Sequence, residues 1–182
     1  TLQASRHIED LKTAFSLSDE ASVPAGRYGF YTGMLSYTMP PGWRLRASLS
    51  ISGGGYYDGA RQSIQVAPTW NASRYIRLNG FYQYNRIRFA GRGQSFDAHI
   101  SRLRAEITPS VEYSISAFLQ YNSAGNIVVG NLRFRYNPRQ GNDLYLVYNE
   151  NLNADRSNTP APPLPLSNQR TILVKYTYTF NW

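Results

Sequence analysis

Strict alternation of apolar and polar residues constrains the fold of this chain more than any other feature. In the stretch WRLRASLSIS, residues 43–52, every second residue from Trp43 to Ile51 is apolar, and the residues between them are arginines and serines. Successive side chains of a β-strand point to opposite faces, so this pattern predicts a strand with one apolar and one polar face. The same pattern recurs over residues 61–70, 76–84, 102–107, 111–122, 128–136, 144–148 and 172–182, less clearly over 28–39 and only poorly over 8–17. We therefore expect an all-β chain of about nine or ten strands.

The connections between the expected strands alternate in length. Tight turns fall at residues 40–42, 71–73, 109–110 and 137–142, and longer loops rich in Gly or Pro fall at 53–59, 90–95, 122–126 and 153–169. Short turns at one end of a meander and long loops at the other are typical of outer-membrane barrels, whose periplasmic turns are short and whose extracellular loops are long. We therefore predict one domain over residues 1–182, an antiparallel up-and-down transmembrane β-barrel in a Gram-negative outer membrane, either closed by this chain or part of a larger barrel.

Composition limits the function without choosing it. The 182 residues include 19 Lys and Arg against 11 Asp and Glu, and the net charge of +8 suits anionic partners. Cysteine is absent, which excludes disulfides, thiolate metal sites and cysteine nucleophiles. No apolar run is long enough to predict a membrane helix, but barrel strands mix polar with apolar residues and leave no such run. The chain starts without Met or a leader peptide, so we expect a mature chain or a fragment of a longer one.

Alternation alone leaves two kinds of fold open. A soluble lipocalin-like barrel or sandwich buries the apolar face, whereas a membrane barrel turns it to lipid. The aromatic residues of that face favour the membrane barrel, because they gather towards both ends of the strands with aliphatic residues between them. The expected membrane-interface girdles contain Trp43, Trp70, Tyr113, Tyr136 and Trp182 at the short-turn end, and Tyr82, Tyr84 and Tyr121 at the long-loop end. Outer-membrane lipid is thus the first expected partner.

The last residues, KYTYTFNW, continue the alternation to the end of the sequence. Phe180 and Trp182 lie two residues apart on the apolar face, and a soluble protein that left such an aromatic edge strand free would risk aggregation. This segment is similar to the terminal aromatic strand that the bacterial barrel-assembly machinery recognises. We therefore expect Phe180 and Trp182 to act as an assembly signal and that machinery to be a partner during insertion.

The polar faces of the expected strands carry an excess of positive charge. The residues predicted to line a lumen are Arg44, Arg46, Arg61, Arg77, Arg102, Arg104, Glu106, Glu112, Arg133, Arg135 and Lys175. Rings of arginine favour anions in pores, so the prediction is a channel or uptake component that favours anionic or hydroxyl-rich solutes. The alternative is that these side chains only fill a small barrel, together with a plug or partner protein.

Other constellations point to no chemistry. Asp97, His99 and Ser101 share a strand face, but parallel side chains about 7 Å apart are poorly placed for a catalytic triad. Tyr56, Tyr57 and Asp58 in GGGYYDG offer a glycan or a metal too few ligands. AGRGQS lacks the strand-to-helix setting of a phosphate loop. Basic and aromatic residues lie on opposite faces, unlike a nucleic-acid stacking platform. We expect no enzyme activity, no catalytic residue, no cofactor, no metal and no nucleic-acid partner.

Several stretches resemble a known family. They are SVPAGRYGFYTGMLSY, SGGGYYDGARQSIQVAPTWNASRYIRLNGFYQYN, RLRAEITPSVEYSISAFLQYNS and LRFRYNPRQGNDLYLVYNE, of which YNPRQGNDLYLVYNE is the most specific. From about residue 11 to 182 the chain resembles the C-terminal barrel region of a family of large bacterial outer-membrane proteins of uncharacterised function, in which an N-terminal carbohydrate-binding-like β-sandwich precedes the barrel. The resemblance implies an outer-membrane location, a C-terminal position in a longer chain and no catalytic residues. It also implies the alternative function, a non-conducting membrane anchor for an N-terminal glycan-binding or glycoside-hydrolysing domain.

Overall fold

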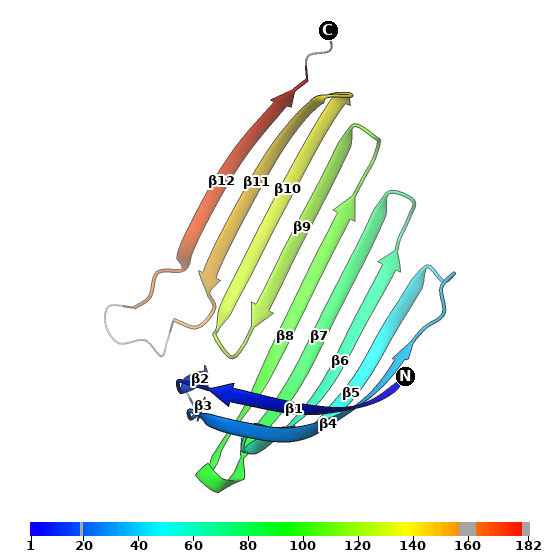
Figure 1. Ribbon diagram of the computed structural model, residues 1–182. Coiled ribbons are helices and arrows are strands. Elements are labelled where there is room, and N and C mark those ends of the chain that lie inside the picture. Colours follow the sequence, from blue (N-terminus) through cyan, green and yellow to red (C-terminus); the bar gives the residue numbers. More distant parts are fainter. Residues whose placement is uncertain (19, 157–162, 180–182) are drawn as a thin grey trace.

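The protein is an open, curved, antiparallel β-sheet. The computed structural model describes residues 1–18, 20–156 and 163–179. The strands are β1 (Leu2–Leu11), β2 (Phe15–Ser18), β3 (Ala21–Val23), β4 (Gly26–Thr38), β5 (Leu45–Tyr56), β6 (Gly59–Asn71), β7 (Ile76–Phe89), β8 (Gln94–Ile107), β9 (Tyr113–Asn122), β10 (Ile127–Arg139), β11 (Asn142–Asn153) and β12 (Ser167–Tyr178). A short 3-10 helix, η1 (Ala90–Arg92), follows β7. Ten strands form one up-and-down sheet in the order β1-β4-β5-β6-β7-β8-β9-β10-β11-β12, and β2 and β3 pair separately (Figure 1).

The prediction of an all-β, antiparallel, up-and-down chain is confirmed, but the sheet is not closed. β1 and β12 lie at opposite edges of the ten-stranded sheet, so a transmembrane barrel does not follow from these strands alone (Figure 1). The weak signal at residues 8–17 corresponds to the end of β1, which begins at Leu2, and to the start of β2. Arg6 interrupts the apolar alternation of β1, which explains why the sequence pattern there is weak.

The two ends of the sheet differ less than the sequence predicts. We call the end with connections 39–44, 72–75, 108–112 and 140–141 the turn end, and the opposite end the loop end. The prediction of long loops at 53–59 and 90–95 is wrong, because only residues 57–58 connect β5 to β6 and only residues 90–93 connect β7 to β8. The predicted loop at 122–126 is likewise a connection of residues 123–126 alone. Gly54, within the paired strand β5, has a positive φ angle of 147°, and Tyr57, in the tight turn that follows, has one of 54°. The GGGYYDG stretch is therefore the end of a strand and a tight turn. Only residues 12–25 and 154–166 are long connections at the loop end.

The strand register places apolar residues of neighbouring strands side by side on the same face of the sheet. Leu49 pairs with Val66, Leu103 with Leu119, and Leu146 with Val174, so apolar residues meet apolar residues from strand to strand. These side chains remain largely uncovered, and many large apolar residues of this face are exposed. The sheet therefore does not bury its apolar face in the described part of the chain.

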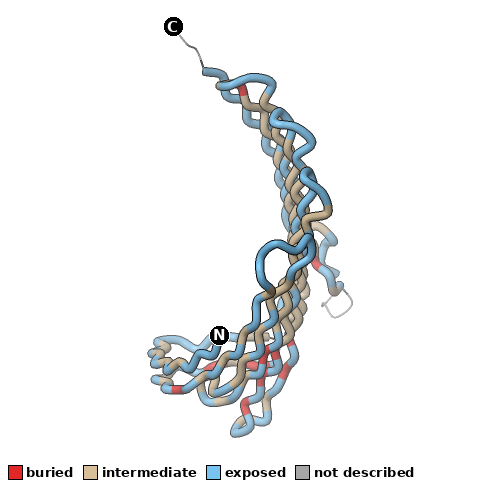
Figure 2. The backbone as a smooth tube through the Cα atoms, turned by 90° about the vertical axis from the view of Figure 1, so that its right-hand side faces the viewer, coloured by how far each residue is buried: buried red, intermediate tan, exposed pale blue. Residues whose placement is uncertain are grey.

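The sheet bends towards its polar face. Figure 2 shows it edge-on as an arc whose N-terminal strands curl round, and most of the buried residues gather there. The β2–β3 hairpin joins β1 to β4 but contacts β8, which lies beyond β5, β6 and β7 in the sheet. Its partners Phe89, Phe96 and Ala98 alternate with convex-face residues, so the hairpin crosses the inner side of the arc. The polar face is thus concave, and the apolar face is convex.

Candidate functional site on the concave face

The concave face carries most of the residues predicted to line a lumen. The structure places Arg46, Arg61, Arg77, Arg102, Arg104, Glu106, Arg133, Arg135 and Lys175 on this face of their strands. Arg44 and Glu112 lie outside the strands, in the connections before β5 and β9. Of the nine strand residues, the cations lie in the half of the sheet nearer the turn end, except that Arg133 lies at the middle of β10 and Arg61 lies near the loop end.

Three arginines line one pocket of about 390 Å³ on β7 and β8. The Arg102 guanidinium lies over the Phe81 ring at 4.5 Å, and that of Arg104 over the Phe118 ring at 5.5 Å. Arg77 donates from Nε to the Asn71 side chain at 3.0 Å. Stacking on an aromatic face orients a guanidinium while leaving its N–H groups free to donate to a carboxylate or a phosphate.

These three arginines have no carboxylate partner within 4 Å in the described ranges. Glu106 is opposite Arg77 in the strand register, yet no ion pair joins them. Glu106 also lines the pocket, so three guanidinium groups face one carboxylate, and this excess of positive charge attracts anions from solution. The pocket is therefore chemically suited to phosphorylated or carboxylated solutes.

Arg135 differs from these arginines, because it has an acidic partner. Its guanidinium lies 2.7 Å from the Asp143 carboxylate, which also accepts a hydrogen bond of 2.9 Å from the Asn137 side chain. The pair neutralises one of the predicted lumen cations. Sequence reasoning missed Asp143, although its position one residue into the strand after a tight turn places it beside the preceding strand.

A second pocket on the same face lies near the loop end. It has a volume of about 360 Å³, and residues of β1, β4, β5 and β6 line it, among them His7, Glu9, Thr32 and Arg61. His7 Nε2 lies 2.9 Å from the Thr32 hydroxyl. Glu9 and Arg61 balance each other in this pocket, whereas three arginines face the single Glu106 in the arginine pocket.

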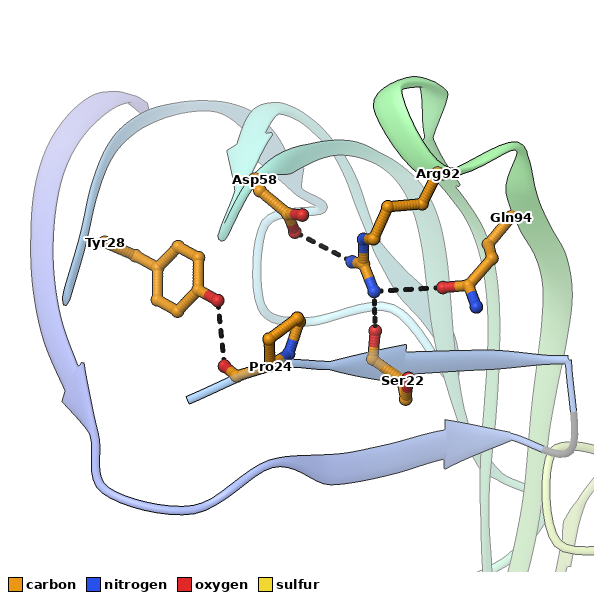
Figure 3. Close-up of polar contacts among 6 residues, drawn as sticks. All are labelled: Ser22, Pro24, Tyr28, Asp58, Arg92 and Gln94. Atoms are coloured by element: carbon orange, nitrogen blue, oxygen red, sulfur yellow. Dashed lines mark hydrogen bonds and ion pairs between the residues drawn. The ribbon is translucent and has the colours of Figure 1, made fainter. Parts of the chain in front are cut away.

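The β2–β3 hairpin and its anchor were not predicted from the sequence. Figure 3 shows Arg92 at the centre, donating to the Ser22 carbonyl of the hairpin, to the Gln94 side chain at 3.0 Å and to the Asp58 carboxylate at 2.8 Å. The Arg92 guanidinium also lies 4.2 Å from the centre of the Phe89 ring. The three groups belong to three separate segments, so one side chain ties the hairpin to the sheet.

An aromatic cluster supports the hairpin from the sides of β4 and β5. Tyr28 donates to the Pro24 carbonyl at 2.8 Å (Figure 3) and packs edge-on against Tyr57, with 5.3 Å between the ring centres. Burial, followed by a hydrogen bond to Glu9, raises the pKa of the Tyr57 phenol to about 12. Tyr57 therefore stays neutral at any physiological pH. Sequence reasoning considered Tyr57 and Asp58 as ligand-binding groups, whereas the structure uses them within the protein.

The convex face carries the residues predicted to form membrane-interface girdles. Trp70, Tyr82, Tyr84, Tyr113, Tyr121 and Tyr136 lie on this face of their strands, and Trp43 lies in the connection before β5. The exposed fractions of Trp43 and Trp70 are 68% and 48%, and Tyr113 stacks on Tyr136 with 4.8 Å between ring centres. Phe180 and Trp182, the predicted assembly signal, lie outside the described residues.

Asp97, His99 and Ser101 also lie on the convex face, away from the arginines. His99 Nδ1 is 2.9 Å from the Tyr82 hydroxyl, and no hydrogen bond joins His99 to the Asp97 or Ser101 side chain in the described part of the chain. The three residues therefore do not form the nucleophile–base–orienter chain of a triad. Among the described residues, no cluster of three or more His, Asp or Glu side chains could hold a metal ion.

Comparisons with known proteins leave the family undecided. No family model matches the chain, and no curated protein is significantly similar to it. None of the helices in the described residues has the length and apolar character needed to cross a membrane.

Proposed function

We propose that this chain forms the wall of a Gram-negative outer-membrane β-barrel that conducts small anionic solutes along its concave, arginine-bearing face. One observation carries the proposal: the ten strands separate a largely apolar, uncovered face with aromatic residues towards its ends from a concave face that holds the arginine pocket. The arginines of the convex face, such as Arg86, Arg88 and Arg170, lie towards the loop end of their strands. In a bilayer, lipid chains would cover the apolar side chains of this face and remove them from water, while the arginines would stay hydrated in a water-filled interior. The two free edges then pair with each other or with further strands, since open edges are not tolerated in lipid.

The arginine pocket specifies the solute class in this proposal. Arg77, Arg102 and Arg104 would interact with carboxylate or phosphate oxygens as the solute passes the turn-end half of the wall. At roughly 8 Å in water, one guanidinium contributes about 0.5 kcal/mol of Coulomb energy to a passing monovalent ion, and salt at about 0.1 M roughly halves this. Each arginine lowers the energy of an anion and raises that of a cation by this amount, so two arginines separate the two ions by about 1 kcal/mol. Two arginines together should therefore change the ratio of anion to cation permeability by about fivefold.

The experiment is to insert the purified protein into planar bilayers and to measure the reversal potential across a KCl gradient. We expect an anion-selective conductance, and we expect the double variant Arg102→Gln/Arg104→Gln to lose about fivefold in selectivity. Arg88→Gln is the matched control, because Arg88 lies on the convex face and should leave the reversal potential unchanged. A cation-selective conductance contradicts the proposal. Absence of conductance would favour the second candidate, a membrane anchor, because the β2–β3 hairpin fills part of the concave side.

A further inference from the structure

The connection between β1 and β4 takes an indirect route. These strands are neighbours, and Leu11 pairs with Gly26 at the loop end, so a two-residue turn would suffice to join them. Residues 12–18 and 20–25 instead leave the sheet, form the β2–β3 hairpin and cross the inner side of the arc to β8. In a barrel, such a segment narrows the interior.

The hairpin is docked by the hydrophobic core of the described residues. Val23 is fully buried and Ala21 nearly so, at 0% and 3% exposure, and both belong to one buried cluster with Phe89 and Phe96, which are 0% and 9% exposed. Elsewhere the concave face is mostly polar and open, and no other buried apolar cluster forms on it among the described residues. The apolar residues at the loop ends of β7 and β8 therefore need another explanation than strand pairing. Their burial beneath the hairpin provides it.

Arg92 joins this core to its surroundings. Its bonds to the Ser22 carbonyl, Asp58 and Gln94 connect the hairpin, the β5–β6 turn and β8. The Arg92 and Asp58 side chains are only 23% and 36% exposed, so solvent screens this ion pair less than one on an open surface. A charged side chain that bonds to three segments fixes their relative positions.

We propose that the β2–β3 hairpin is a constriction segment that sets the largest solute able to pass along the concave face, and that Arg92 is the positioning residue that holds it there. The inference rests on the proposed function, because size selection requires a conducting barrel. The docking of the hairpin by Arg92 does not require conduction and is tested separately.

The first test measures docking. Since the chain has no cysteine, Val23→Cys introduces a single thiol at a fully buried position with little change in volume. We expect this thiol to react slowly with a water-soluble thiol reagent in detergent, and the reaction rate to rise about tenfold or more when Arg92→Met is added. Arg88→Met, at the same end of β7 but on the convex face, is the control and should leave the rate unchanged. Asp58→Asn removes only the ion pair, so the reaction rate should lie between that of Val23→Cys alone and that of Val23→Cys with Arg92→Met. This variant still tests the docking if Arg92→Met fails to fold.

The second test measures size selection. Replacing residues 12–25 by Asn-Gly joins the paired Leu11 and Gly26 with a two-residue hairpin turn. We expect a larger single-channel conductance than that of the wild type, about twofold or more, and passage of larger neutral polyethylene glycols.

The outcomes separate this inference from the proposed function. If the wild type conducts and the deletion changes neither conductance nor size limit, the constriction is refuted while the channel stands. If neither conducts, the channel and the constriction both fail. If Val23→Cys reacts as fast as an exposed thiol, or Arg92→Met and Asp58→Asn leave its rate unchanged, the role of Arg92 is refuted in either case. If only the variant that lacks residues 12–25 conducts, the hairpin closes the path along the concave face in the wild type, which supports the inference.

Discussion

Replacing Leu132 by arginine is the sharpest test of whether the convex face contacts lipid. Leu132 is 47% exposed and pairs with Ala117, which lies four residues from both Tyr113 and Tyr121 on β9. Four residues span about 13 Å along a strand, or roughly 10 Å of depth at a tilt near 40°, which is close to the middle of an apolar band about 25 Å tall. We therefore expect Leu132→Arg to destabilise the protein in lipid by about 2–4 kcal/mol.

The same substitution has no such effect where the side chain faces water. A half-exposed leucine on a solvated surface can be replaced at a cost of about 0.5 kcal/mol or less. Gln65→Arg is the matched control, since Gln65 lies on the concave face opposite Ser50 and Gln83 and away from the arginine pocket.

Urea unfolding in phospholipid vesicles measures the difference. With a slope of about 2 kcal/mol per molar urea, Leu132→Arg should lower the midpoint by about 1–2 M, and Gln65→Arg should leave it nearly unchanged. Equal midpoints for the two variants would refute the assignment of the convex face to lipid. So would a purified chain that is monomeric and folded without detergent.

Two further predictions concern the loop end of the sheet. Gly54→Ala should destabilise the protein by at least about 2 kcal/mol, because a Cβ there would lie 2.3 Å from the Tyr31 carbonyl oxygen at a φ of 147°, whereas Gly53→Ala, with its nearest atom at 3.7 Å, should have little effect on the unfolding midpoint. The pKa of Tyr57 is raised to about 12, so the neutral phenol favours the folded state; its contribution is complete below pH 10 and is lost as the pH rises towards 12. The unfolding midpoint should therefore fall more between pH 10 and pH 12 for the wild type than for Tyr57→Phe, and equal losses would show that burial and the hydrogen bond to Glu9 do not raise the pKa of Tyr57.

Strands and faces were predictable from the sequence because they depend on a local property. The side chains of Leu45, Leu49 and Ile51 alternate with polar ones, and this period alone determines that they share a face. Strand pairing then places Arg77 of β7 on the same, concave face as Arg102 and Arg104 of β8. The unpaired arginine pocket follows partly from this pattern, but the stacking of Arg102 on Phe81 depends on register, which alternation does not specify.

The hairpin was not predictable because its stability comes from contacts distant in the sequence. Residues 12–25 show no strong alternation, and Val23 is buried only because Phe89 and Phe96 lie beneath it. Arg92 belongs to the stretch AGRGQS, which the sequence predicts to be one of the longer loops, yet two of its three partners are 34 and 70 residues away. One local signal existed: Ile87 and Phe89 place apolar side chains on the polar face of β7, which indicates that something covers them.

The edges of the sheet give the last prediction. β1 runs from the turn end to the loop end and β12 runs in the opposite direction, so the two can pair directly, or an even number of antiparallel strands can stand between them. An unpaired N–H or C=O group in lipid costs several kcal/mol, so a ten-stranded arc cannot persist in a bilayer with both edges open. We therefore expect the backbone amides of β1 and β12 to be as strongly protected from hydrogen exchange in vesicles as those of the central strand β8. In an open sheet, every second amide of an edge strand points away from its partner and exchanges quickly. Fast exchange at alternate residues of β1 or β12, with β8 protected, would show an open edge and would exclude a closed membrane barrel.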